Sequence, residues 1–292
     1  MIAAISLFSA MSSFIKAAER IPAGEAVFFR SFCALPLILL WLWWQRDLPH
    51  GLKTTNWRNH AVRGIAGTAA MGLGFIGLRL LPLPEVTAIR FATPIFVVIF
   101  AAILLGEKIR LVRVSAVLVG LVGVTIVMWP RLNFDGGDLA LYGALVTLAS
   151  SGLAALAQVF IKTMAGTEKT AAIVFYFSLT ASCLSLLTLP FGWVWPTGLE
   201  WGLLIGAGLV GGLGQIFLTA SYRYAEAGTL APFTYVSMIW ALAIGYFVFN
   251  EVPTLAMLLG AALVISSGVT IVLRERQLGM QRTAERKLRV QD

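Results

Sequence analysis

Two arginines interrupt otherwise apolar runs of the sequence, Arg30 within residues 24–45 and Arg90 within residues 84–105. Each lies six residues from the end of its run that we expect to face outward. At about 1.5 Å per helical residue, both guanidinium groups would lie roughly 9 Å below the outer helix ends. A guanidinium at that depth binds a carboxylate through two parallel hydrogen bonds. Both arginines are therefore candidates for binding an acidic group of a substrate.

The same two side chains have a simpler interpretation. A long arginine side chain can extend along its helix toward the membrane surface, where Glu25, Glu85 or lipid headgroups would satisfy its charge. Because two neighbouring cations repel each other, we also expect at least one of the arginines to have an acidic partner. Substrate binding and an internal ion pair are both open on the sequence alone.

Aromatic and amide side chains form a second group of candidates. Trp240 lies near the middle of residues 227–249, five residues after Tyr235. A tryptophan at that depth needs a partner for its indole N–H, and a polar cavity supplies one. Gln158 and Gln215 are uncharged polar residues within other apolar runs. Packing, or hydrogen bonds between helices, is the alternative interpretation for this group.

Residue patterns for catalysis are missing. The only histidines, His50 and His60, lie between the second and third apolar runs, and neither HExxH nor GxSxG occurs. An intramembrane enzyme is therefore a distant alternative, and we expect no metal and no cofactor. A pore would need rings of like charge or a repeated filter sequence, and neither recurs. No Asp or Glu lies deep in an apolar run, which favours facilitated transport or exchange over tight proton coupling.

Composition places the chain in a membrane. Hydrophobic residues make up 59% of it and charged residues 12%, with a mean hydropathy of +0.85, whereas soluble domains carry about 25% charged residues. Runs of this kind must form helices in lipid, because only a helix satisfies its own backbone polar groups there. The net charge of +8 comes from connections and the tail rather than from one amphipathic face. Nucleic acid is therefore not an expected partner, and the lipid bilayer is.

The apolar runs predict an all-α integral membrane protein with ten transmembrane helices. The first run lacks a basic leader, so we interpret it as a helix and not as a signal peptide, and a natural start upstream of Met1 stays open. The predicted spans are residues 1–18, 24–45, 61–79, 84–105, 110–129, 139–161, 169–190, 200–222, 227–249 and 253–273.

Basic residues predict the orientation of these spans. With ten spans, sixteen of the 22 lysines and arginines fall on the side of the two termini and four on the other side, with Arg30 and Arg90 inside spans. Connections rich in lysine and arginine stay in the cytoplasm. We therefore expect both termini to be cytoplasmic and the protein to be multi-pass in a bacterial inner membrane, while the oligomeric state is not predicted.

An internal repeat organises the spans. GLG at 72–74, Glu107 and GVTIV at 123–127 recur in the same order as GLG at 212–214, Glu251 and GVTIV at 268–272, at an offset of 140 to 145 residues. The repeats are residues 1–130 and 138–273, followed by a basic tail at 274–292. Since each repeat has five spans, the second enters the membrane from the opposite side. Inverted repeats of this kind are typical of transporters whose substrate site lies near the membrane midplane.

The two repeats resemble the EamA family of the drug/metabolite transporter superfamily over essentially the whole chain. The first-half motif is matched by Thr87–Phe91, Thr93, Pro94, Phe96 and Leu104–Glu107. The second-half motif is matched by Ala231, Pro232, Tyr235, Trp240, Glu251 and Pro253. Arg90 and Asn250 depart from the family, which usually has a small or apolar residue and a glycine at these places.

This resemblance implies alternating access and export or exchange of small metabolites such as amino acids, with the branch that exports aromatic amino acids nearest. A multidrug carrier, or a carrier of other metabolites such as nucleoside-like compounds or cofactors, is the alternative. From the residues themselves, we expect Glu107 and Glu251 to cap the helices that follow them. Structural or gating roles are also expected for Pro94, Pro232, Gly72, Gly74, Gly212 and Gly214.

Overall fold

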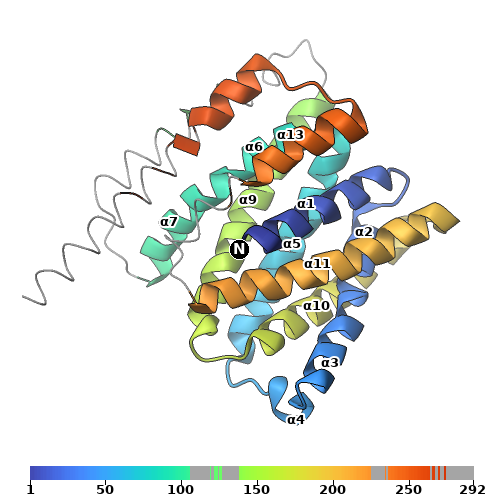
Figure 1. Cartoon of the computed structure of the whole chain (residues 1–292), viewed down its shortest axis with the longest axis vertical. Helices are drawn as coiled ribbons and strands as arrows, with labels where there is room; N and C mark the ends of the chain where they lie inside the picture. Colours follow the sequence, from blue (N-terminus) through green and yellow to red (C-terminus); the bar gives the residue numbers. More distant parts are fainter. Residues whose placement is uncertain are drawn as a thin grey trace, which may run out of the picture.

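The computed structural model describes residues 1–105, 138–224 and 236–263, together with residues 119, 122, 123, 125, 126, 234, 265, 266, 269 and 273. Every regular element within these residues is helical (Figure 1). The expected spans 110–129 and 253–273 lie partly outside the described residues, and so does the connection at 131–138. The tail at 274–292 lies wholly outside them.

The helices follow the apolar runs. Those of the first half are α1 (Ile2–Ala17), α2 (Ala23–Phe32), α3 (Ala34–Trp44), α4 (Leu48–Gly51), α5 (Trp57–Leu80), α6 (Leu83–Arg90) and α7 (Ala92–Leu105). Those of the second half are α9 (Asp138–Ala165), α10 (Thr170–Leu186), the short 3-10 helix η2 (Leu189–Phe191), α11 (Gly198–Tyr224) and α13 (Val236–Phe249).

Five helical stretches of the described chain are long and apolar enough to cross a membrane, and shorter apolar helices accompany them. The shorter ones are Ile2–Ala17, Thr170–Leu186 and Val236–Phe249. The long ones are Ala23–Trp44, Trp57–Leu80, Leu83–Leu104, Leu139–Ala165 and Gly198–Tyr224. The protein is thus an all-helical membrane protein.

Two of the long stretches are broken near their middle, and proline accounts for both breaks. Pro36 cannot donate a backbone hydrogen bond to the Phe32 carbonyl, and α2 ends at Phe32. Pro94 likewise cannot donate to the carbonyl of Arg90, and α6 ends at Arg90. A proline inside a helix removes one bond of the ladder and crowds the preceding turn. Each break therefore leaves a helix end, with its exposed carbonyls, inside the bundle.

Helices of the two halves pack against each other in a reciprocal way. In Figure 1, α1 lies between α11 on one side and α13 on the other, and α6 lies beside α13. Likewise α9 packs against α5 and against α6 and α7. The α5–α9 contact is close because Gly77 has no side chain: an added Cβ there would overlap the Thr147 hydroxyl. The first helix of each half thus contacts the third and fourth spans of the other half.

Glu168, in the connection between α9 and α10, holds the start of α5. Its Oε1 accepts hydrogen bonds from the Thr55 N–H at 3.0 Å, the Thr54 hydroxyl at 3.0 Å and the Asn56 N–H at 3.3 Å. These donors lie at the N-terminus of α5, where backbone N–H groups have no partner within the helix. A buried carboxylate from the second half therefore fixes one end of a helix in the first half.

We predict that Glu168→Ala lowers the free energy of unfolding by about 2 kcal/mol, because it removes a buried carboxylate and leaves partly buried N–H groups without their acceptor. Chemical unfolding of the detergent-solubilised protein measures the change. Lys169→Ala is the neighbouring control: Lys169 lies 2.6 Å from Asp47, but both side chains are substantially exposed, so its loss should cost less than about 1 kcal/mol. Equal losses in the two variants would contradict the role of Glu168.

The difference in stability between the wild type and Glu168→Ala should also depend on pH. Burial raises the pKa of Glu168, but the hydrogen bonds from Thr55, Thr54 and Asn56, together with the electrostatic interaction with His60, lower it more, so its pKa lies below the ordinary value. A carboxylate with a lowered folded-state pKa stabilises the protein above its unfolded-state pKa, and the contribution is lost as pH falls through the folded-state pKa. The difference between wild type and Glu168→Ala should therefore shrink as the pH is lowered through that window.

Candidate functional site

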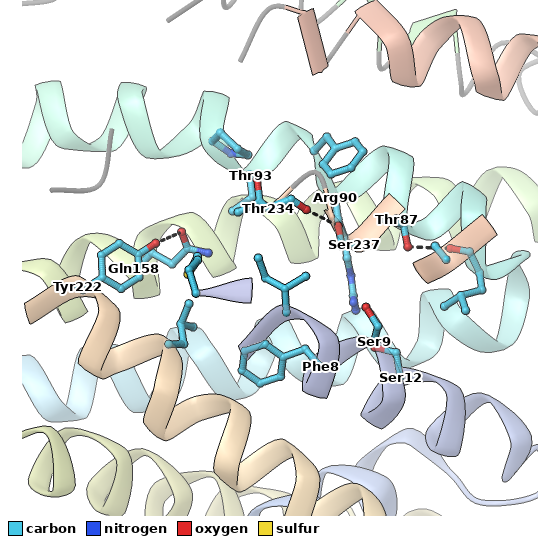
Figure 2. A pocket seen from close by; sticks show the side chains of 17 residues that line it. Phe8, Ser9, Ser12, Thr87, Arg90, Thr93, Gln158, Tyr222, Thr234 and Ser237 are labelled. Carbon is cyan, nitrogen blue, oxygen red and sulfur yellow. Dashed lines mark hydrogen bonds between the residues drawn. The ribbon is translucent and has the colours of Figure 1, made fainter. Parts of the chain in front are cut away.

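A cavity of about 260 Å³ lies between α1, the α6–α7 break, α13 and the ends of α9 and α11. Figure 2 shows Arg90 pointing into it toward the face of α1 that carries Ser9 and Ser12. At its other end the Tyr222 hydroxyl donates a hydrogen bond of 3.1 Å to Gln158 Oε1. The rest of the wall is mainly apolar. Small-molecule sites usually have this character, with a few polar groups on an apolar wall.

A second cavity of about 290 Å³ extends from the first toward α2, α5 and α10. Arg30 and Arg63 line only this second cavity, whereas Arg90 lines both. Arg90 is therefore the cation at the junction. The residues shared by the two cavities are Phe8, Ser12, Arg90, Thr93, Gln158 and Leu218.

Arg90 owes its position to a proline and a glycine. It is the last residue of α6, because Pro94 ends that helix, and a cation is favourable at the carbonyl end of a helix. Its guanidinium passes over α5 at Gly74, where an added Cβ would overlap Nη2 of Arg90. The missing side chain at Gly74 thus leaves the space that the arginine occupies.

Arg30 lies in the last turn of α2 and is only 2% exposed. Its Nη2 makes long hydrogen bonds to the Gly211 carbonyl, at 3.4 Å, and to Gln215 Oε1, at 3.5 Å. Glu25 does not serve it, since Glu25 Oε2 accepts the Val194 N–H at 3.0 Å. For Arg30, the expected acidic partner is not found among the described residues. The structure places both Arg30 and Gln215 in the second cavity.

Arg63 completes the set, and sequence reasoning missed it. The orientation count places Arg63 with the cytoplasmic basic residues, although it lies two residues inside the predicted span 61–79. In the structure α5 begins earlier, at Trp57, and buries Arg63 to 3% exposure. Its Cζ lies 3.9 Å from the Phe177 ring centroid, and Cζ of Arg30 lies 5.3 Å from the same centroid. Placing the start of the span at the polar residues 57–59 would have put Arg63 nearly two turns inside the helix and made it a candidate.

These three arginines give the cavities a positive charge that no described lining residue balances. None of the described residues that line either cavity is Asp or Glu. Nε and Nη1 of both Arg30 and Arg63 are buried without a hydrogen-bond partner in the described structure. An arginine does not give up its proton, and a buried charge without a partner is costly. The arrangement therefore favours an anion in the second cavity.

Trp240 lies beside the first cavity rather than among the described residues that line it. Its indole N–H donates to Ser6 Oγ of α1 at 2.9 Å, and the side chain is 42% exposed. The neighbouring residues Ser237 and Ala241 line the cavity instead. The hydrogen bond joins α13 to α1, and substrate contact by Trp240 stays a prediction.

A largely buried ion pair near Leu83, at one end of the first cavity, joins the two halves. Lys16 Nζ lies 2.9 Å from Glu251 Oε1 and donates to the carbonyls of Leu78 and Leu81 at 3.2 and 3.0 Å. Oε2 of Glu251 accepts the Leu83 N–H at 2.8 Å. The pair therefore fastens α1, the end of α5 and the start of α6 to the end of α13.

Glu251 thus caps a helix, but not the one we expected. The expectation that it caps the helix following it in the chain is wrong, because there Thr254 Oγ1 accepts the Met257 N–H at 3.3 Å. Asn250 explains the difference. It adopts a positive φ of 55°, and the Glu251 N–H turns back to the Gly245 carbonyl at 2.8 Å. Asparagine is one of the few residues other than glycine that adopt this conformation readily.

The remaining structural candidates divide by their surroundings. An added Cβ would meet Ala34 at Gly212 and Phe8 at Gly214, both at helix contacts, whereas nothing lies within 4 Å at Gly72. Pro94 lines the first cavity. Glu107, Pro232 and Tyr235 lie outside the described residues, so their roles stay predictions.

Comparison with known proteins gives consistent results. The model of the EamA-like transporter family matches residues 1–129 and 141–273. A pseudopaline exporter of Pseudomonas aeruginosa (strain UCBPP-PA14) is 32% identical over 268 residues, which are 91% of this chain and 89% of the relative. An S-adenosylmethionine uptake transporter of Rickettsia prowazekii (strain Madrid E) is 26% identical over 272 residues, 93% of this chain and 90% of the relative.

A solved crystal structure shares the fold, with a TM-score of 0.70 and 21% sequence identity. The match covers 94% of this chain and 96% of the other. At this level of identity the likeness concerns the architecture alone.

We predict that Lys16 and Glu251 are energetically coupled. Glu251→Gln should lower the free energy of unfolding by on the order of 2 to 3 kcal/mol, because it leaves the mostly buried Lys16 without its anion. A double-mutant cycle with Lys16→Met should give a coupling energy above about 1 kcal/mol.

The control cycle uses Lys169 and Asp47, which are closer together at 2.6 Å but far more exposed. Its coupling energy should stay below about 1 kcal/mol. A Lys16–Glu251 coupling no larger than that of the control pair would contradict a buried link between the halves.

Proposed function

The chain belongs to the EamA-like transporter family, and from this premise we propose that it exports or exchanges small carboxylate-bearing metabolites, amino acids and compounds derived from them, across a bacterial inner membrane. The observation that carries the proposal is the cluster of Arg30, Arg63 and Arg90 around cavities with no described acidic lining residue. A substrate carboxylate would supply the missing negative charge and accept paired hydrogen bonds from a guanidinium.

The wall of the first cavity suits an amino acid with an apolar side chain. Phe8, Phe91 and Leu218 line it together with Arg90. Aromatic and hydrophobic amino acids are therefore the first substrates to test. The two relatives described above differ in name, one being an exporter and the other an uptake transporter, so the family allows either direction, and we propose export or exchange for this chain.

Transport in this proposal follows alternating access in a bundle of ten spans, arranged as two inverted five-helix repeats with both termini cytoplasmic. The reciprocal packing of α1 on α11 and of α9 on α5 supports a pseudo-twofold relation. The Lys16–Glu251 pair would hold one side closed. Since no described lining residue is Asp or Glu, the substrate moves down its own gradient rather than with a coupled proton.

We predict that Arg90→Ala lowers counterflow of a transported amino acid at least about tenfold in proteoliposomes, because a hydrogen-bonded charged contact is worth about 1.5–3 kcal/mol. Arg90→Lys keeps the charge but loses the planar guanidinium group, so its counterflow rate should lie between those of the wild type and Arg90→Ala. Arg79→Ala is the control, since Arg79 is exposed and lines neither cavity.

The amide of the same amino acid, which has no carboxylate, should be a poor substrate for the wild type. Efficient transport of the amide, together with undiminished flux in Arg90→Ala, would contradict the proposal. That result would favour a multidrug carrier, or a carrier of other metabolites, that relies on the apolar wall.

A further inference from the structure

The three arginines form two groups, and α5 shows how far apart these groups lie. An added Cβ on Gly67 would overlap Nη1 of Arg63, and one on Gly74 would overlap Nη2 of Arg90. Residues seven apart in a helix lie on the same face, two turns apart, which is about 10 Å along the axis. The guanidinium groups of Arg63 and Arg90 therefore lie over the same face of α5, separated by roughly that distance.

The first group, which we call the inner group, consists of Arg30 and Arg63. Both guanidinium groups lie near the ring of Phe177, and the two residues are only 2% and 3% exposed. Nε and Nη1 of each lack a hydrogen-bond partner in the described structure. Two like charges against one ring repel each other, and unpaired N–H groups in a buried site are costly. An anion in the second cavity would relieve both effects.

The outer group is Arg90 alone. It lines both cavities, whereas the inner pair lines only the second. One carboxylate is far shorter than the distance between the groups, so a single carboxylate cannot contact Arg63 and Arg90 at the same time. The cavities therefore offer two separate places for an anion, joined by the apolar residues Phe8 and Leu218, which line both.

We propose that the preferred substrate is an elongated dicarboxylate, with one carboxylate bound by Arg30 and Arg63 and the other by Arg90. The proposal rests on the proposed function, since it assumes that carboxylates enter these cavities. A charge-assisted hydrogen bond takes about 2.8 Å at each end. Across a gap of about 10 Å this leaves roughly 4 to 5 Å between the two carboxylate groups, which fits carboxylates separated by a chain of about two or three atoms.

The test compares two ligands of equal chain length that differ in one group. These are glutamate, which has a second carboxylate, and 2-aminopentanoate, which has a methyl group in its place. Calorimetric titration of the full-length protein in nanodiscs measures both affinities. We expect the wild type to bind glutamate at least about tenfold more tightly than 2-aminopentanoate. Arg90→Met, which keeps the length but not the charge, should abolish that preference.

Gly74→Ala and Gly72→Ala form a matched pair that leaves every arginine in place. An added Cβ at Gly74 displaces the flexible end of Arg90, whereas at Gly72 nothing lies within 4 Å. Gly74→Ala should therefore reduce the preference for the dicarboxylate, and Gly72→Ala should keep it. The closest atoms belong to the flexible end of Arg90, and the Ser150 hydroxyl oxygen, 3.0 Å from the added Cβ, needs to shift by only a few tenths of an ångström, so the Gly74 variant is expected to fold.

The outcomes separate this inference from the proposed function. If the wild type binds the two ligands equally well, the two-anion inference fails and the carboxylate cavity stands. If neither ligand binds, and no other amino acid does, both fail. If glutamate keeps its advantage in Arg90→Met, the assignment of the outer carboxylate to Arg90 is overturned.

Discussion

The structure depends on one constraint, the free-energy cost of burying charged guanidinium groups inside a membrane protein. Arg30 and Arg63 are almost fully buried, Arg90 lines the adjoining cavity, and no described acid lines the same space. The protein lessens this cost with neutral groups: the Gly211 carbonyl, the Gln215 amide and the Phe177 ring. Such contacts solvate a cation in part but do not neutralise it. In our account the substrate supplies the remaining negative charge.

Proline and glycine make the arrangement sterically feasible. Pro36 and Pro94 break two spans next to Arg30 and Arg90, so that each arginine lies at the carbonyl end of a helix. Gly67 and Gly74 then leave room on α5 for the guanidinium groups. Two carboxylates of the second half, Glu168 and Glu251, hold the start of α5 and the start of α6. The two helices that carry Arg63 and Arg90, α5 and α6, are thus both anchored by the opposite half of the chain.

The helices and two of the three cavity arginines could be predicted from the sequence, because helix formation in lipid depends on local composition. The apolar runs, the family and the two intramembrane arginines were all readable from single segments. Arg63 was missed because it lies only two residues inside the predicted span and is counted there with the cytoplasmic basic residues, whereas α5 begins four residues earlier, at Trp57. The partner of Glu251 could not be inferred either, since Leu83 is 168 positions away in the chain. Depth along a helix follows from sequence, but the direction that Trp240 faces depends on its contact with Ser6.

The most direct test of this account is the stability of the protein without substrate. If the arginines are held for a substrate anion, replacing Arg63 by methionine should raise the unfolding temperature of the empty protein, since an unpaired buried charge is removed, and should remove most of the stabilisation that a bound carboxylate gives the wild type. If Arg63→Met instead lowers the unfolding temperature and leaves stabilisation by the carboxylate unchanged, Arg63 is a structural residue and the central claim is wrong.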